Sequence, residues 1–463
     1  MRYEGNRVKD LSVAYIGGGS RDWAWCFMRD LALEEQMEGV IRLYDIDREA
    51  AENNAVIGNR ISAHPDAKAR WEYKAVDSLK DALVGADFVI ISILPGTFDE
   101  MDSDVHAPEK YGVYQAVGDS VGPGGCIRTL RTVPMYVPIA QAIKAYAPDA
   151  WVINYTNPMA QCVAALYEVF PGVKAIGCCH EVFHAMDLLC CMLHDKLGVD
   201  VQRQQLRCTV SGVNHFTWIT SAYYNEIDLF PMFREFCLEH VEEGYDETGH
   251  SLWRGDPFKS AHCALMDMFL RYGAIPAAGD RHLTEFLPPW YLKDPETVAK
   301  WRFGLTSVKW RKEDLLERLA RSERLRTGEE AIDLTPSGEE GHLMMKALLG
   351  LGDMISNVNL PNRGQISNLP MGAVVETNAY FSRDGVTPIM SGDLPGGVLG
   401  LVMPHAVNQK NVLKAVLTGN KELAFQAFLN EPLMQPVSPW DARVLFEEML
   451  HNTSEYLPDA FKA

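Results

Sequence analysis

The feature that most constrains the fold is an apolar segment that runs directly into glycines. The run LSVAYI is followed by Gly17, Gly18, Gly19 and Ser20, and the next segment, DWAWCFMRDLALEEQ, has helical spacing. A strand, a glycine turn and a helix in this order are typical of loops that let a pyrophosphate approach the backbone at a helix N-terminus. The pattern therefore predicts the start of a dinucleotide-binding α/β domain.

The glycine fingerprint is incomplete, because its third glycine position falls on Asp22. A second predicted strand, VIRLYDID, carries Asp45 near its end. A carboxylate at this place can hold both ribose hydroxyls and would repel a 2′-phosphate, so it favours NAD over NADP. A plain glycine turn in an α/β protein remains the alternative.

Predicted strands and helices alternate as far as about residue 195, which is the pattern of a doubly wound parallel sheet. Beyond residue 200, QRQQLRCTVSGVNHFTWITSAYYN and AVVETNAYFSRDGVTPI have the alternation of antiparallel strands, and long helical segments lie between them. We predict an α/β protein with a Rossmann-like NAD-binding domain over 1–200. A mixed α+β domain for catalysis, substrate binding and oligomerisation is expected over 201–463.

Charge and composition exclude several classes of protein. The 463 residues carry a formal net charge of −19, which argues against nucleic acid as a partner. No run of 18 apolar residues and no apolar signal segment occur, so we expect no membrane span and a cytoplasmic location. The ten cysteines lack the spacing of a small secreted domain, so thiols or metal ligands are expected rather than disulfides.

A cysteine and a histidine follow two different predicted strands. Cys179 follows VKAIG, and His215 follows CTVSGVN. Two ligands from two strand ends leave open coordination positions, as a substrate-binding metal requires. A buried thiol and a hydrogen-bonded loop histidine are the alternative, and the residues alone favour that alternative.

Several motifs in order resemble the family 4 glycoside hydrolases, the NAD- and metal-dependent glycosidases. They are GGGS, YDID, GPGG with LRTVP, NYTNP, CCHEV, GVNHFTW, YGAIPAAGD and LPNRGQISNLPMGAVVE, and they cover nearly the whole chain. The resemblance implies a fold of the lactate and malate dehydrogenase-like superfamily. It also implies an unusual mechanism, since NAD-dependent members are exceptions to the two-carboxylate scheme. In that mechanism NAD oxidises the sugar at C3, a base removes the C2 proton beside a divalent metal, and the C1 substituent is eliminated.

The resemblance also assigns roles to individual residues. Cys179 and His215 match the two protein ligands of the metal, which we expect to be Mn2+. Asn157 matches the substrate-binding asparagine, and Asn154 is expected to assist it.

The proton-transfer residues stay open. Asp280 matches an aspartate proposed as the base, and Tyr272 lies where other members use a tyrosine. His180 is the candidate acid, with a water molecule as the alternative.

The sequence CHEV is similar to that of the subgroup acting on α-galacturonides, which are pectin-derived oligosaccharides of a sugar acid. Glu181 would then bind sugar hydroxyls or orient a histidine, and Arg131 would bind the C6 carboxylate. Arg128, Arg281 and His282 are further candidates for that carboxylate. We expect a homo-oligomer, a dimer or a tetramer.

The alternative substrates are α-glucuronides and neutral α-glycosides. Two alternatives belong to other functional classes. One is a plain NAD-dependent 2-hydroxy-acid dehydrogenase, and the other is a catalytically idle cofactor sensor. The pair Cys179 and His215 discriminates between these classes, since a plain dehydrogenase of this fold needs no metal.

Overall fold

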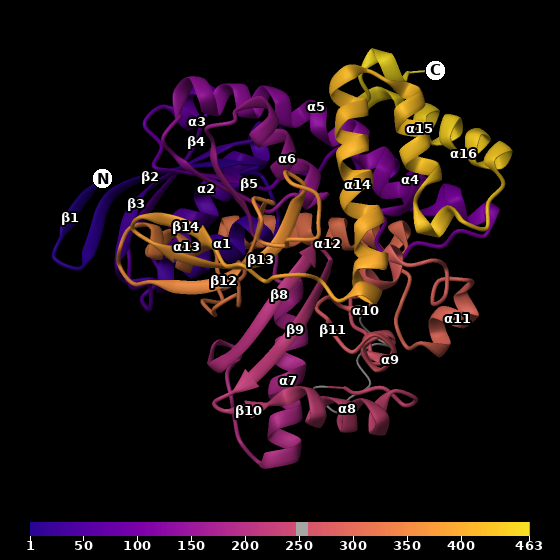
Figure 1. The fold of residues 1–463 in the computed structure, drawn as a ribbon. Helices are drawn as coiled ribbons and strands as arrows, with labels where there is room; N and C mark the ends of the chain where they lie inside the picture. Colours follow the sequence, from indigo (N-terminus) through magenta and orange to yellow (C-terminus); the bar gives the residue numbers. More distant parts are fainter. Residues whose placement is uncertain (247–257, 463) are drawn as a thin grey trace.

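The computed structural model describes residues 1–246 and 258–462, which share one continuous 14-stranded sheet (Figure 1). Along the sheet the strands are ordered β10-β9-β8-β13-β12-β7-β6-β5-β2-β3-β4, and β1, β11 and β14 pair at its sides. Six neighbouring strands, from β7 to β4 in this order, are parallel. The order reverses between β2 and β5, which is the switch point of a doubly wound sheet, and the Rossmann-like prediction is confirmed.

The parallel strands and the helices that connect them occupy the N-terminal part of the chain. The strands are β2 (Arg7–Ile16), β3 (Met37–Tyr44), β4 (Trp71–Ala75), β5 (Phe88–Ile91), β6 (Trp151–Asn154) and β7 (Lys174–Gly177). The helices are α1 (Trp23–Leu33), α2 (Arg48–Ser62), α3 (Leu79–Leu83), α4 (Phe98–His106), α5 (Gly122–Tyr146), α6 (Met159–Val169) and α7 (Glu181–Leu197).

Strand β2 shows why this sheet is buried on both faces. Successive side chains of a strand point to opposite faces. Val13 and Tyr15 join one apolar core with α1 and α2, and Ala14 and Ile16 join the other core with α5 and α6. A near-continuous apolar run is therefore what a central parallel strand needs.

The antiparallel strands extend the same sheet beyond β7. They are β8 (Leu206–Val213), β9 (Phe216–Tyr224), β10 (Ile227–Asp228), β11 (Ile275–Pro276), β12 (Met354–Pro361), β13 (Val374–Ser382) and β14 (Gly385–Pro388), and β1 (Arg2–Glu4) flanks β2. The predicted antiparallel segments are confirmed, since β8 pairs with β9 and β13 pairs with β14. Because β12 joins β7, residues from both sides of position 200 share this sheet. The domain boundary at 200 stays a prediction.

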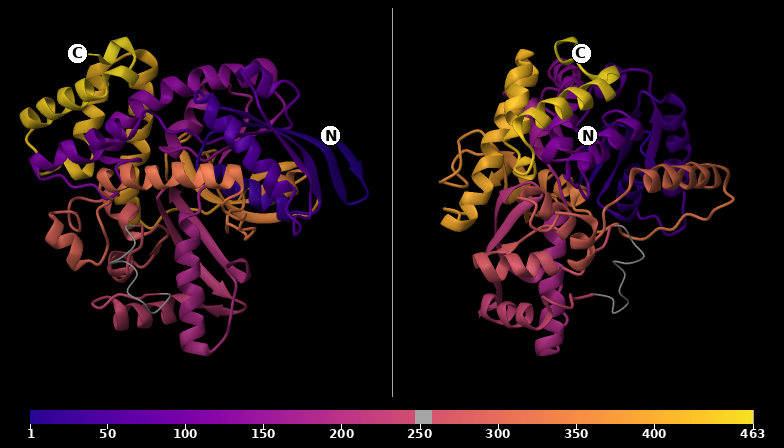
Figure 2. Two further views of the ribbon diagram at one scale, coloured as in Figure 1. Left: turned by 180° about the vertical axis from the view of Figure 1, so that it is seen from behind. Right: turned by 90° about the vertical axis from the view of Figure 1, so that its right-hand side faces the viewer.

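The remaining helices all follow β10 in the chain. They are α8 (Leu229–His240), α9 (Cys263–Tyr272), α10 (Asp280–Leu283), α11 (Pro295–Lys300), α12 (Val308–Thr327), α13 (Gly341–Leu348), α14 (Gly396–Thr418), α15 (Lys421–Leu429) and α16 (Pro439–Asn452). Figure 2 shows α12 crossing the molecule between the N-terminal part and the lobe that carries α8 and α9. Within the described residues, none of the helices combines the length and apolar character that crossing a bilayer requires.

Helix α5 begins earlier than its periodicity predicts. The apolar spacing indicates a helix from Thr132, yet the helix starts at Gly122 and takes GPGG into its first turn. A proline fits there, since the first helical N–H groups lack intrahelical acceptors. The early start places Asp119 and Ser120 directly before a helix.

Candidate active site

Five separate segments meet beyond the carboxyl ends of β6 and β7. Asn157 follows β6, and Cys179 follows β7. His215 lies in the turn between β8 and β9 and has the left-handed φ of 61°. Asp119 precedes α5, and His282 lies on α10.

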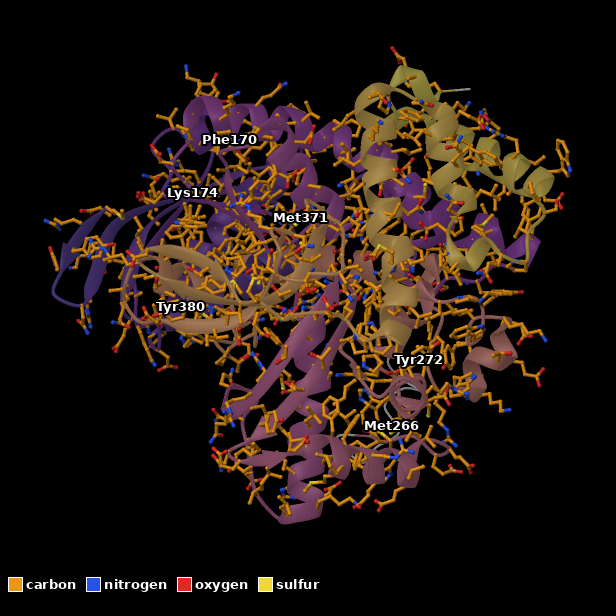
Figure 3. All side chains as sticks on the ribbon, in the orientation of Figure 1. Phe170, Lys174, Met266, Tyr272, Met371 and Tyr380 are labelled. Atoms are coloured by element: carbon orange, nitrogen blue, oxygen red, sulfur yellow. The ribbon has the colours of Figure 1, made fainter. Side chains whose placement is uncertain are left out.

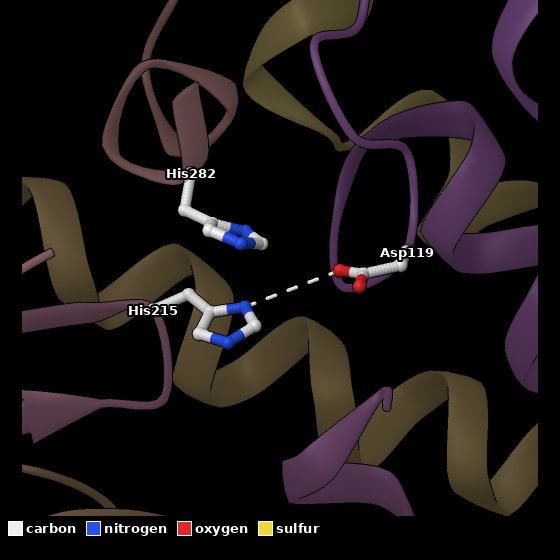
Figure 4. Close-up of side chains that lie close together, drawn as sticks. All are labelled: Asp119, His215 and His282. Atoms are coloured by element: carbon white, nitrogen blue, oxygen red, sulfur yellow. Dashed lines mark ion pairs between the residues drawn. The ribbon is translucent and has the colours of Figure 1, made fainter. Parts of the chain in front are cut away.

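Asp119, His215 and His282 form the tightest group of ligand-type side chains (Figure 4). One ligand atom of each lies within 4.8 Å of the others. His215 Nδ1 is 3.9 Å from Asp119 Oδ1, and the two imidazole rings lie with centroids 3.9 Å apart. We call these three residues the Asp-His-His cluster.

The charges within this cluster suit a cation. Burial would raise the pKa of Asp119, but His282 and His215 outweigh it and hold this pKa at about 2. Burial, together with His282, lowers the pKa of His215 to about 3. A carboxylate beside neutral imidazoles is the protonation state in which these groups bind metals.

A second group, His180, Glu181 and His184, adjoins the first. Glu181 links the two, since its Oε1 lies 3.8 Å from His282 Nε2. Its Oε2 accepts a hydrogen bond of 2.8 Å from the Gly279 backbone N–H. Burial opposes ionisation of Glu181, but His282 and the other histidines keep its pKa below the ordinary value.

Cys179 is buried beside this site but belongs to neither group. Its carbonyl oxygen accepts from Asn357 Nδ2 at 3.1 Å, and the same Nδ2 donates to Glu376 Oε1 at 2.6 Å. Burial and then Glu376 raise the pKa of the Cys179 thiol. Asn214, which precedes His215, donates to Glu376 Oε2 at 3.2 Å and so connects the cysteine segment with the β8–β9 turn.

Several buried polar atoms around the site have no hydrogen-bond partner in the described chain, among them Asn157 Oδ1, Asn214 Oδ1 and His282 Nδ1. Buried polar atoms are normally bonded. The amide of Asn157 is oriented by a 3.2 Å bond from its Nδ2 to Asp119 Oδ2, which leaves its oxygen available. A bound cation or sugar hydroxyls would supply the missing partners.

The glycine turn is tightly packed against its own chain. A Cβ on Gly17, which has φ 88°, would lie 1.9 Å from the Ser92 carbonyl oxygen. A Cβ on Gly18 would lie 2.7 Å from Leu43. Asp45 accepts from the backbone N–H of Gly19 at 2.8 Å, so this acid helps to hold the turn in place.

The chain matches two parts of one known family. Residues 12–194 match family 4 glycosyl hydrolases, and residues 210–434 match the C-terminal domain of the same family. This chain belongs to glycoside hydrolase family 4. The expected family and enzyme class are thereby confirmed, and the plain dehydrogenase and the sensor are set aside.

Individual relatives of this family 4 glycoside hydrolase are similar over their full lengths. An alpha-galacturonidase of Thermoanaerobacterium saccharolyticum is 57% identical over 99% of this chain and 98% of its own. The crystal structure of lplD from Bacillus subtilis superposes with a TM-score of 0.91 at 53% identity, covering 96% of this chain and 100% of the other. A 6-phospho-alpha-glucosidase from gut microorganisms, solved with NAD and Mn2+, shares the fold with a TM-score of 0.80 at 20% identity, covering 97% and 99%.

Two side chains that were predicted to bind the substrate of this glycoside hydrolase bind other protein groups instead. Asn154 is fully buried, donates to the Thr156 carbonyl at 3.0 Å and accepts from Tyr136 Oη. Arg131 is fully buried, and both of its terminal nitrogens bind the carboxylate of Asp104. Both predictions are corrected: Asn154 supports the turn after β6, and Arg131 neutralises a buried acid.

The two candidate bases lie at opposite ends of α9. Asp280 is fully buried, and its carboxylate accepts from the backbone N–H of Leu265 at 2.9 Å and of Ala264 at 3.2 Å. It therefore satisfies the first N–H groups of the helix. Tyr272 is the last residue of α9, and its ring lies beside Trp218 and the start of α14 (Figure 3).

His180, the candidate acid, is a half-buried member of the second ligand group. Its Nδ1 lies 2.9 Å from Glu339 Oε1, and its Nε2 lies 3.9 Å from Glu181 Oε1. Glu339, like Glu376, is a site residue that sequence reasoning missed.

Cationic side chains gather next to Asp119. Arg128 is buried, and its Nε donates to the Asn157 carbonyl at 3.3 Å. Arg281 donates to the Ala116 carbonyl at 3.2 Å, in the segment leading to Asp119. Arg311 of α12 faces the same Phe258 ring as Arg281, with guanidinium-to-centroid distances of 5.6 Å and 5.2 Å.

Sequence reasoning missed Asp119 and Arg311 as site residues. For Asp119 a signal existed, since it stands just before the quoted GPGG motif. For Arg311 there was none, because it lies in a helix rich in charge throughout.

Proposed function

We propose that this family 4 enzyme hydrolyses α-galacturonides with the help of NAD and a divalent metal, most suitably Mn2+. The observation that carries the proposal is the 57% identity, over 99% of the chain, with a protein named alpha-galacturonidase. The segment CHEV supports it, because Glu181 occupies the junction between the two ligand groups.

The proposed metal ligands are His215 and Cys179, with Asp119 and His282 within reach of His215. The unpartnered Asn214 Oδ1 and His282 Nδ1 fit a cation or its bound oxygens. The proposed NAD site is the turn of Gly17, Gly18, Gly19 and Ser20 with Asp45. When bound, NAD would exchange a hydride with sugar C3, and the metal would draw electron density from the oxygens on C2 and C3.

The chain's own residues orient the sugar and move protons. The Asn157 oxygen is available to a sugar hydroxyl, since its amide nitrogen is held by Asp119. His180, between Glu339 and Glu181, can hold a proton near the leaving group. Of the two candidate bases we retain Tyr272, because the Asp280 carboxylate is already bonded to two backbone N–H groups.

The C6 carboxylate of a galacturonide needs cationic partners in a protein with a net charge of −19. The Asp119 segment is surrounded by Arg128, Arg281 and Arg311. Their three positive charges exceed the negative charge of the Asp119 carboxylate. No ion pair or hydrogen bond occupies the Arg311 guanidinium within residues 1–246 and 258–462. We propose Arg311 and Arg128 as the carboxylate-binding residues, in place of Arg131.

The deciding experiment is turnover of digalacturonate in deuterium oxide with NAD, Mn2+ and reductant. Removal of the C2 proton predicts galacturonate that carries deuterium at C2, read by NMR. Product without the label at full rate would exclude the elimination mechanism, since direct displacement never breaks that bond. Tenfold faster cleavage of an α-glucuronide or an α-galactoside corresponds to about 1.4 kcal/mol of transition-state preference. That result would show that the proposed substrate is wrong, and the proposed mechanism would stand. Oligomeric state and cytoplasmic location stay predictions.

A further inference from the structure

Asp22 stands at the third glycine position of the NAD fingerprint, yet its carboxylate does not cap the helix it begins. Asp22 is the N-cap of α1, a place where aspartate normally accepts from the next backbone N–H groups. Here no such side-chain bond is made. The residue has φ 138°, a conformation that glycine adopts readily and aspartate rarely.

The carboxylate is instead paired with a residue almost three hundred positions later. Arg318 Nη1 on α12 lies 2.6 Å from Asp22 Oδ2 and donates to the Arg21 carbonyl at 3.3 Å. The Nε of Arg318 donates to Asp314 Oδ2 at 2.6 Å, one turn earlier on α12, which fixes the direction of the guanidinium. Arg21 is itself paired with Asp47 at 3.3 Å, so both charges of the loop have partners.

We infer that Arg318 is a positioning residue of the cofactor site. It neutralises Asp22 and turns the carboxylate away from the first N–H groups of α1, which leaves them to the diphosphate of NAD. A free carboxylate at this position would repel that diphosphate, and this explains how an aspartate can replace the fingerprint glycine. The inference rests on the proposed NAD dependence.

The same helix reaches the other half of the site. Arg311 and Arg318 are seven residues apart on α12, so they lie on the same side of the helix, two turns apart. Arg311 shares the Phe258 ring with Arg281, which donates to the Ala116 carbonyl ahead of Asp119, whereas Arg318 contacts Asp22 of the cofactor loop. Helix α12 thus connects the proposed NAD and sugar-acid sites, as its course across the molecule in Figure 2 allows.

The test is the Kd of NAD for the full-length protein, measured by calorimetry without substrate. Arg318→Gln should raise this Kd about tenfold, because two carboxylates then face the loop without their cation. Asp22→Asn alone should leave the Kd unchanged or lower it. The double variant Asp22→Asn/Arg318→Gln should return it to within about threefold of wild type. Arg326→Gln is the matched control, since Arg326 lies on the same helix and its guanidinium pairs with nearby Glu323.

Each other outcome overturns the inference. An Arg318→Gln protein that binds NAD as wild type does would show that the ion pair is irrelevant to the loop. A double variant as weak as Arg318→Gln would show that Arg318 contacts the cofactor directly. If Asp22→Asn alone weakened binding, Asp22 would be a cofactor ligand. A wild-type protein that binds no NAD would instead refute the proposed function, and thermal midpoints separate all these cases from misfolding.

Discussion

The imidazoles of His215 and His282 lie against each other, with ring centroids 3.9 Å apart and planes inclined by 36°. One ring comes from the turn between β8 and β9, and the other from α10. Burial lowers the pKa of both histidines, so both rings are neutral near pH 7. Neutral rings at this distance, beside the Asp119 carboxylate, can share one cation without repelling each other.

The first prediction concerns the metal. Cys179→Ser and His215→Ala should each weaken Mn2+ binding by about 100-fold or more, and His282→Ala by about tenfold, since it stands beside the proposed ligands. The Kd of NAD should stay nearly constant, because the glycine turn is a separate structure. Paramagnetic resonance of free Mn2+ measures the effect, and His194→Ala, on an exposed histidine, is the control. A Cys179→Ser protein with wild-type Mn2+ affinity would show that the metal rests on the Asp-His-His cluster alone.

The second prediction concerns the substrate carboxylate. Arg311→Gln should raise KM for a galacturonide by about tenfold or more, because a charge-assisted contact is lost. It should leave cleavage of the corresponding neutral α-galactoside unchanged. Lys309→Gln, on the exposed side of the same helix, is the matched control. Equal losses on both substrates would assign Arg311 a structural role.

The third prediction concerns the base. Tyr272→Phe should lower kcat by about 100-fold or more while thermal stability and NAD binding stay as in wild type. Exchange of the C2 proton with solvent, followed by NMR, should fall in parallel. Exchange at the wild-type rate in this variant would remove Tyr272 from the proton transfer.

The fourth prediction concerns the other candidate. Asp280→Asn should lower the free energy of unfolding by about 1–2 kcal/mol, because an amide has one acceptor oxygen where the carboxylate uses two. Urea denaturation measures this change. If stability were unaffected and C2 exchange vanished, Asp280 would be the base instead.

The fifth prediction is a pH dependence of stability that arises from one buried carboxyl group, that of Glu431. Burial raises the pKa of Glu431 to about 7, although the Gly122 N–H and Asn408 donate to it. The folded protein therefore holds this proton where the unfolded chain has released it. Stability falls as pH rises from the ordinary carboxyl range to about 7, and the loss is complete above it. Glu431→Gln should lack this loss, so its stability relative to wild type should rise by roughly 1–3 kcal/mol between pH 5 and pH 8. A constant difference across this range would contradict the shifted pKa.

The sequence by itself determined the parallel sheet, the glycine turn and the family. Alternation along β2 encodes burial on both faces, and the glycines of the turn are required by their close approach to Ser92 and Leu43. These are local properties, because strand period and backbone freedom act over a few residues. The order of short motifs added the enzyme family. The substrate-binding roles of Asn157 and Glu181 stay predictions, and in the fold both residues lie beside the Asp-His-His cluster.

Only the tertiary structure decided which polar side chains meet. Arg131 and Arg128 lie in the same helix and look equivalent in the sequence. In the fold Arg131 binds the Asp104 carboxylate, whereas Arg128 donates to the Asn157 carbonyl. Asp280 lies in a motif of the family, but the start of α9 binds its carboxylate. Asp119, His282 and Arg318 come from elements brought together by the sheet order and by α12. A buried charge takes the partner that packing places beside it, and that partner lies at a sequence distance which no local period encodes.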